Sequence, residues 1–116
     1  MAHTHHAIDY VEITAPDLAA AKAFYSAAFG WTFNDYGPRY AGIVGETREQ
    51  GGLAQGEPGG AGGPLVVLYS DDLDATLAAV KSAGGTISTE PFDFPGGRRF
   101  HFTDPGGNEL AVWSER

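Results

Sequence analysis

The sequence predicts an α+β domain built from two copies of one strand-helix-strand-strand-strand module. Asp17 and Asp72 stand 55 positions apart, and each is followed by leucine and an alanine-rich segment. Gly30 and Gly85 lie at the same distance from the two aspartates. Because 116 residues support only one modest core, the two copies should pack together. We therefore expect a single domain, residues 1–116, with module one at 7–55, a glycine-rich connector at 56–63 and module two at 64–115.

Module one begins with a segment rich in β-branched residues, Ile8 to Thr14, which predicts a strand ending at Pro16. Asp17 is a candidate N-cap for the alanine-rich helix, and Gly30 is the residue expected to end it. Three further strands are expected at 31–34, 39–45 and 52–55.

Module two repeats this order. We expect strands at 65–69, 86–89, 98–103 and 109–114 and a helix at 72–83. Pro91 and the segments 95–97 and 104–108 should supply turns, because proline, glycine and asparagine favour turn conformations.

Composition excludes several classes of function. A net charge of -8 with only seven lysines and arginines disfavours binding to nucleic-acid phosphates and to anionic lipid. No apolar segment approaches the roughly 20 residues of a membrane span, and residues 1–6 lack the features of a secretory signal, so we expect a cytoplasmic protein. The absence of cysteine excludes thiol chemistry, and His3, His5 and His6 would bind metal only adventitiously.

Several local motifs, taken in order, resemble those of the vicinal oxygen chelate superfamily, which includes glyoxalase I, extradiol dioxygenases and bleomycin-resistance proteins. The resemblance covers nearly the whole chain, and its motifs are Asp17-Leu18, Phe24-Tyr25, Phe29-Gly30-Trp31, Ala83-Gly84-Gly85 and Asp104-Pro105-x-Gly107-Asn108. It implies paired modules that each form a glyoxalase-like partial barrel around a cavity, in chains that usually assemble as a homodimer.

The resemblance also implies where a divalent metal would bind: at a His or Gln in the first strand of each module and at carboxylates in the last strands. Tyr10 and Leu65 occupy the first pair of positions, Ala111 replaces one carboxylate, and the other position corresponds to Leu53 or Gln55. We therefore expect no metal cofactor. The alternative is a rearranged site for zinc, nickel, manganese or iron, made from Glu12, His101 and Glu109 with a contribution from Gln55.

Strand alternation predicts which side chains face the cavity. The cavity face should carry Tyr10, Glu12, Leu65, Val67, Glu109, Ala111 and Trp113, while Val11, Ile13, Val66, Leu68, Leu110 and Val112 should pack under the helices. Trp31, Gln55 and His101 complete the predicted ligand-binding set. Aromatic walls with a few acidic groups suit a small organic molecule, aromatic or cationic, although Tyr10 and Trp113 would equally serve as core.

Three functions follow. The first is a metal-free small-molecule-binding protein of the bleomycin-resistance type. The second is a divalent-metal-dependent lyase, isomerase or dioxygenase with the rearranged site. The third is a cofactor-free enzyme in which Glu12 or Glu109 removes a proton while Tyr10 donates to the developing oxyanion. We favour the first, because the inherited ligand positions are lost and the chain is acidic.

Overall fold

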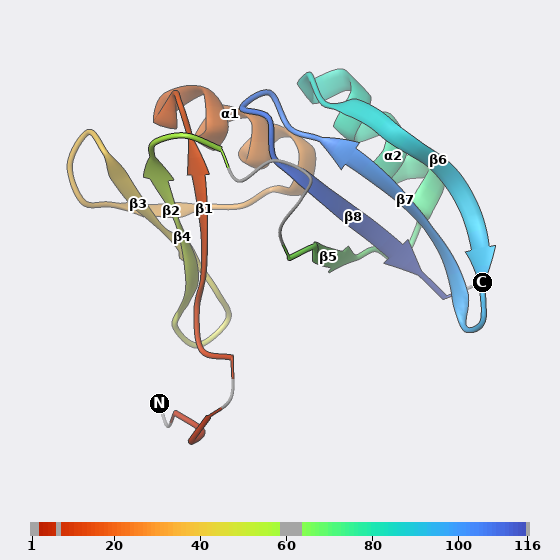
Figure 1. Ribbon diagram of the computed structural model, residues 1–116, viewed down its shortest axis with the longest axis horizontal. Coiled ribbons are helices and arrows are strands. Elements are labelled where there is room, and N and C mark those ends of the chain that lie inside the picture. The colour runs from red at the N-terminus through yellow and green to blue at the C-terminus, as the bar shows by residue number, and fades with distance from the viewer. Residues whose placement is uncertain (1–2, 7, 59–63, 116) are drawn as a thin grey trace.

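The structure is a computed structural model that describes residues 3–6, 8–58 and 64–115, so part of the predicted connector lies outside the described residues. The described residues form two four-stranded sheets and two helices (Figure 1). Sheet one has the order β1-β4-β3-β2 and sheet two the order β5-β8-β7-β6. The elements are β1 (Val11–Ala15), α1 (Leu18–Phe29), β2 (Phe33–Asp35), β3 (Tyr40–Val44), β4 (Glu49–Gln55), β5 (Val66–Tyr69), α2 (Leu73–Ala83), β6 (Thr86–Phe94), β7 (Gly97–Thr103) and β8 (Glu109–Ser114). The predicted fold class, two βαβββ modules, is confirmed.

The sequence repeat corresponds to a repeated pattern of strand pairing in the two sheets. In each module the first strand pairs in parallel with the last, and the other pairings are antiparallel. Ile13 lies opposite Leu53 in sheet one, and its counterpart Leu68 lies opposite Val112 in sheet two. A parallel pair requires a crossover, and the helix of each module provides it.

Both helices begin and end as the repeat predicts, with one correction. The side chain of Asp17 accepts a hydrogen bond from Ala20 N at 3.1 Å, and Gly30 adopts the left-handed conformation with φ 73°. Asp72 caps α2 in the same way. The left-handed residue after α2 is Gly84, with φ 107°, and not Gly85. Gly85 is instead needed for packing, because a Cβ there would lie 2.7 Å from a methyl of Val80.

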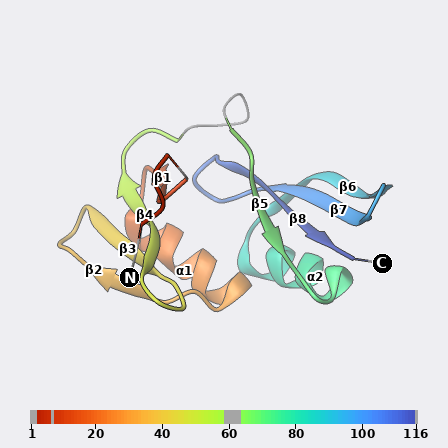
Figure 2. The ribbon, with the colours of Figure 1, turned by 90° about the horizontal axis from the view of Figure 1, so that it is seen from below.

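The two modules share one core. The helices lie side by side on the same side of both sheets (Figure 2). Phe24 and Tyr25 of α1 are buried, and the Phe24 ring lies 6.0 Å from that of Phe102 in sheet two. Neither module therefore encloses its apolar residues alone. Neither helix of the described residues is long and apolar enough to cross a membrane.

The turn at 104–108 fastens the modules together. Asp104 is buried, and its Oδ1 accepts hydrogen bonds from Gly106 N at 3.0 Å and Asn108 N at 2.9 Å. The side-chain amide of Asn108 donates to the carbonyl of Thr14 at 2.6 Å, which joins this turn to β1. The motif is thus a turn with a structural role across the two halves.

Three strand predictions need correction. The first strand begins at Val11 rather than Ile8, and β4 begins at Glu49 rather than Gly52. Pro91 does not end a strand: β6 continues through it to Phe94 with an irregular register between Thr89 and Phe92. β6 is the edge of its sheet, where a proline is tolerated because no ladder hydrogen bond is lost on the open side.

Candidate ligand-binding site

Each sheet has one face toward the helices and one face away from them. The face away from the helices is called the first open face in module one and the second open face in module two. The first open face carries Tyr10, Glu12, Asn34, Tyr40 and Glu49 above two glycines, Gly42 and Gly52. The second carries Leu65, Val67, Tyr69, Glu109, Ala111 and Trp113 with Phe92, Arg99 and His101.

Two tyrosines lie together on the first open face. The hydroxyls of Tyr10 and Tyr40 share a short hydrogen bond directly above Gly52, where a Cβ would lie 2.0 Å from the Tyr40 oxygen. Loss of solvent around the Tyr40 hydroxyl, together with its contacts to Tyr10 and the Glu12 carboxylate, raises the pKa of Tyr40 well above its ordinary value. Tyr40 therefore stays a neutral hydrogen-bonding group at physiological pH.

Glu49 is the second polar centre of this face. It accepts hydrogen bonds from the Tyr36 hydroxyl and from Asn34 Nδ2, the latter at 2.9 Å. Its carboxyl group lies over Gly42, where a Cβ would approach within 2.3 Å. The hydrogen bond from Tyr36, and then that from Asn34, lowers the pKa of Glu49 below its ordinary value. The first open face is thus a phenol and carboxylate surface, suited to ligand donors and cations.

The second open face is mostly apolar. Leu65 is 37% exposed, Val67 42%, Tyr69 51% and Phe92 38%, so these side chains do not pack into the core. The rings of Tyr69 and Trp113 meet edge to face, with centroids 5.0 Å apart. Exposed aromatic and aliphatic groups gathered on one sheet face provide contact area for another molecule.

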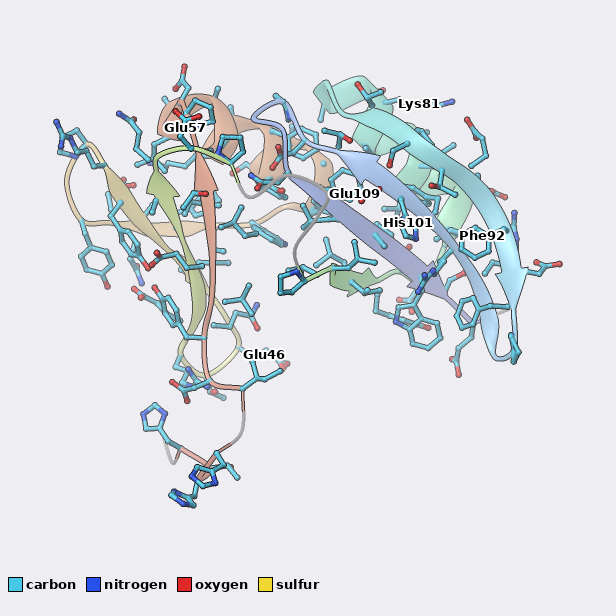
Figure 3. All side chains as sticks on the ribbon, in the orientation of Figure 1. Glu46, Glu57, Lys81, Phe92, His101 and Glu109 are labelled. Atoms are coloured by element: carbon cyan, nitrogen blue, oxygen red, sulfur yellow. The ribbon has the colours of Figure 1, made fainter. Side chains whose placement is uncertain are left out.

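A cluster of polar side chains lies on this otherwise apolar face. His101 Nδ1 lies 3.7 Å from Glu109 Oε2, which also accepts a hydrogen bond from Ser88 Oγ at 3.1 Å. Glu109, His101 and Phe92 belong to β8, β7 and β6 (Figure 3). The Arg99 guanidinium lies over the Phe92 ring, 5.4 Å from its centroid. Arg99 Nε and His101 Nε2 are buried and have no hydrogen-bond partner among the described residues.

The predicted site residues fall into three places. Tyr10 and Glu12 lie on the first open face, and Leu65, Val67, His101, Glu109, Ala111 and Trp113 lie on the second. Trp31 and Gln55 lie on neither. Trp31 stacks on Tyr25 with centroids 4.6 Å apart, and Gln55 Oε1 accepts a 3.4 Å hydrogen bond from Leu18 N at the start of α1. One chain therefore does not gather the predicted residues around one cavity.

A separate cleft lies between the modules on the helix side. It measures about 200 Å³ and is lined by Val11, Ile13, Trp31, Ile43, Gln50, Gly51, Val66 and Leu68. Four of these residues were expected to pack under the helices; Ile13 is buried, whereas Val11 is 37% exposed. Apart from Trp31, no predicted ligand-binding residue reaches the cleft. Its volume is below the roughly 300 Å³ at which pockets for drug-sized ligands begin.

The described residues of one chain do not assemble a site for a divalent metal ion. They contain no group of three or more histidine, cysteine or carboxylate side chains that could hold one. His101 and Glu109 form a pair, but Glu12, the third member of the alternative site, lies in the other sheet. Within the part of one chain that the structure describes, the donor groups thus fall short of the set that a divalent ion requires.

Two site residues are not predicted from the sequence. Asn34 and Glu49 depend on the register of β2, β3 and β4, which is set by the sheet and not by local sequence. The available signal was glycine inside a strand, at Gly42 and Gly52, because such glycines mark places where another group approaches the backbone closely.

Comparison with known proteins agrees with the architecture. A model of the glyoxalase/bleomycin resistance protein/dioxygenase superfamily matches residues 7–112. The chain is 31% identical to the anthracycline biosynthesis protein DnrV of Streptomyces peucetius, over 90% of this chain and 45% of that protein. It is also 31% identical to the putative glyoxylase CFP32 of Mycobacterium tuberculosis, over 90% of this chain and 44% of that one. The chain thus spans about half the length of these curated relatives.

Solved structures show the same fold. A glyoxalase/bleomycin resistance protein/dioxygenase family enzyme from Burkholderia phytofirmans superposes with a TM-score of 0.79 at 20% identity, covering 94% of this chain and 98% of that one. TnmS3, an antibiotic binding protein from a Streptomyces species, superposes with a TM-score of 0.71 at 24% identity, covering 100% and 99%. The family match, the curated relatives and the duplicated βαβββ architecture lead to one conclusion: the chain belongs to the glyoxalase/bleomycin resistance protein/dioxygenase superfamily.

Proposed function

We propose that this protein binds a small organic molecule, aromatic or cationic, without a metal, in cavities that are completed when two chains associate. The observation that carries the proposal is the second open face, where Leu65, Val67, Tyr69 and Phe92 expose apolar side chains around Trp113. A single chain leaves this surface uncovered, although large exposed apolar patches on soluble proteins usually mark a binding site.

The first open face supplies the other wall of the proposed cavity. Glu12 and Glu49 offer carboxylates, and Tyr10 and Tyr40 offer hydroxyls, on a surface that the net charge of -8 makes attractive to cations. Flat aromatic contact on one wall and acceptors on the other suit a molecule that combines a ring with a positive charge. Two similar proteins, an anthracycline biosynthesis protein and an antibiotic binding protein, also support a small organic ligand.

A second copy of this chain is the partner that closes each cavity. Both open faces lie on the side of the sheets away from the helices, so they stand next to each other and do not enclose a space within one chain (Figure 2). A two-fold axis between two chains would lay the first open face of each on the second open face of its partner. Relatives of about twice this length have room for two such units in one polypeptide.

Cofactor-free proton transfer is the second candidate, and the pair of His101 and Glu109 favours it. A carboxylate 3.7 Å from an imidazole nitrogen orients a proton acceptor, as in many general bases. Glu12, the alternative proton acceptor, and Tyr10, the expected donor to the oxyanion, are exposed in the single chain and would need the partner to exclude water.

Binding of proflavine, a planar aromatic cation, tests the principal proposal. We expect it to raise the melting temperature by the amount that RT ln(1 + [L]/Kd) predicts. Trp113→Ala and Glu12→Gln should each weaken binding by about tenfold, since each removes a contact worth about 1–2 kcal/mol. Glu57→Gln is the matched control, because Glu57 is exposed and lies outside the strands of both sheets. Equal affinities for proflavine in the unmodified protein and all three variants would contradict the proposal that the open faces bind the ligand.

Sedimentation equilibrium tests whether two copies of the chain associate. The chain has a mass of 12.2 kDa, and we expect a species of twice that mass at micromolar concentration. Val67→Glu, which places a charge at the centre of the second open face, should shift the equilibrium to the monomer, while Ala20→Glu on the exposed side of α1 should not. A monomer at every concentration would contradict the shared cavity.

A further inference from the structure

Among the described residues, two nitrogen atoms of side chains on the second open face have no hydrogen-bond partner, and their hydrogen-bonding roles indicate which functional group a ligand would need. Arg99 Nε and His101 Nε2 are both buried, and neither finds a hydrogen-bond partner in the described part of the chain. They stand two residues apart on β7 and therefore project from the same face of the sheet, with Cα atoms roughly 7 Å apart. Buried polar atoms are normally paired, so a pair of orphans on an open face indicates a group that arrives from outside.

The two atoms have different hydrogen-bonding roles. Arginine Nε carries a hydrogen and only donates. His101 turns Nδ1 toward the Glu109 carboxylate, 3.7 Å away, and Glu109 is held by Ser88. A carboxylate beside Nδ1 favours the tautomer with its hydrogen on that nitrogen, which leaves Nε2 as an acceptor. The face thus presents one donor and one acceptor.

Aromatic side chains surround this pair. The Phe92 ring lies under the Arg99 guanidinium and 6.0 Å from the His101 ring, and Trp113 lies opposite Arg99 in the register of β7 and β8. The Phe94 ring lies 6.2 Å from that of Trp113. Such walls accept a flat ring and exclude water from the two nitrogens, which strengthens any hydrogen bond made to them.

We propose that the second open face recognises a phenolic hydroxyl on a planar aromatic molecule. The phenol oxygen accepts from Arg99 Nε–H, and the phenol hydrogen is donated to His101 Nε2. This inference rests on the proposed small-molecule function and specifies the ligand class for one of its two walls.

Other functional groups match less well. A carboxylate only accepts and would leave the His101 acceptor unpaired, and an ammonium only donates and would meet the positive Arg99. A methyl ether accepts but has no hydrogen to give. The net charge of -8 further disfavours an anion, whereas a phenol arrives neutral. Of the groups compared, only a hydroxyl meets both atoms.

Calorimetric titration with beta-naphthol, its methyl ether and beta-naphthoate tests the proposal, because the three probes share one ring system. We expect the naphthol to bind the intact protein roughly tenfold more tightly than either of the others, the usual consequence of leaving a buried polar group unpaired. Arg99→Met and His101→Leu should each abolish this preference while retaining binding of the ether.

Arg98→Gln is the matched control, because Arg98 is the next residue on the same strand and points to the helix side, where it pairs with Asp74 at 3.8 Å. That variant should keep the preference for naphthol. If the variants of Arg99 and His101 do not fold, nitrogen NMR of the unmodified protein replaces them: the Arg99 Nε and His101 Nε2 signals should shift with naphthol and stay in place with the ether.

Three outcomes separate this inference from the proposed function. A preference for naphthol that depends on Arg99 and His101 supports the inference. Equal binding of naphthol and ether, lost together in Trp113→Ala, overturns the hydroxyl recognition and leaves the binding function in place. If none of the three probes binds, the hydroxyl recognition is overturned, and the proflavine experiment alone decides the general function.

Discussion

The hydroxyl of Tyr25 donates a 2.7 Å hydrogen bond to Asp104 Oδ2, and both groups are buried. Tyr25 belongs to the first helix and Asp104 to the turn before the last strand, 79 residues later. The contact joins the two modules at the position where the turn also holds β1 through Asn108 and the carbonyl of Thr14. Burial, together with the Asp104 carboxylate, raises the pKa of Tyr25 far above its ordinary value, so the phenol remains a donor.

Removing this hydroxyl should destabilise the whole domain. Tyr25→Phe removes the shorter of the two hydrogen bonds that the buried Asp104 Oδ2 accepts, the other being the 3.4 Å bond from Asn108 Nδ2. We expect the free energy of unfolding to fall by about 1–3 kcal/mol in urea titrations. Tyr69→Phe is the control, because that side chain is 51% exposed and its hydrogen bond to Glu115 is long at 3.4 Å. Surface changes of this kind usually stay within about 0.5 kcal/mol. Equal unfolding midpoints for Tyr25→Phe and the unmodified protein would show that Asp104 does not need the tyrosine.

The glycine under the tyrosine pair should be sensitive to a single methyl group. In Gly52→Ala the new Cβ would lie 2.0 Å from the Tyr40 hydroxyl oxygen, so the ring must move, and Tyr40 should lose its contact with Tyr10. Because the clash is with the end of a side chain, we expect the fold to persist while the pKa of Tyr40 returns toward its ordinary value. Alkaline titration of tyrosine absorbance measures this shift. Gly56→Ala, with no atom within 4 Å of the new methyl, should titrate like the parent.

The acid side of the stability profile should depend on Asn34 and Tyr36. Their hydrogen bonds lower the pKa of Glu49, so the stability that Glu49 contributes is present above its unfolded pKa and is lost as the pH falls through the lowered folded value. In the double variant Asn34→Ala, Tyr36→Phe the folded pKa should rise toward 4.5, and that part of the acid-induced loss should disappear. Carbon NMR of the Glu49 carboxyl group follows the pKa directly. An unchanged titration would mean that the two donors do not act on Glu49 in solution.

The purified protein without residues 1–6 should retain no stoichiometric zinc, nickel, manganese or iron. We expect this because Tyr10, Leu65 and Ala111 stand where the family resemblance implies metal ligands, and removal of the tail eliminates adventitious binding by its histidines. Elemental analysis after dialysis against each metal measures the content. One retained ion per chain, lost in His101→Ala, would instead support a site that Glu12 of a second copy completes with His101 and Glu109.

Much of the fold can be predicted from the sequence, because the internal repeat indicates the same order of elements in both modules. The Asp17 and Asp72 caps, the left-handed Gly30 and the alternating strand β8 all follow from local rules, and the structure has them. Pro91 does not form the turn that its residue type predicts, because its tolerance within a strand depends on β6 lying at the edge of the sheet. Edge position is a property of the assembled sheet and leaves no local signal.

The candidate site is less predictable for the same reason. Alternation groups Val67 with Ala111, and these two residues are neighbours across β5 and β8. It does not show that Tyr10 and Glu12 lie on another sheet, nor that Tyr40 reaches over a glycine to meet Tyr10. Cross-strand partners depend on register, and register within β2, β3 and β4 is set by packing over distance.

The division of one chain into a phenol and carboxylate face and an aromatic face has a consequence for mixed assemblies. In the symmetric pair that we propose, each cavity would take one wall from each polypeptide. If a chain damaged at Glu12 is mixed with a chain damaged at Trp113, every hybrid pair carries one cavity with two intact walls and one with two defective walls. Two proteins that each bind weakly would then regain full affinity in half of the cavities of the hybrids on simple mixing. A protein whose sites each lay within one chain would regain none.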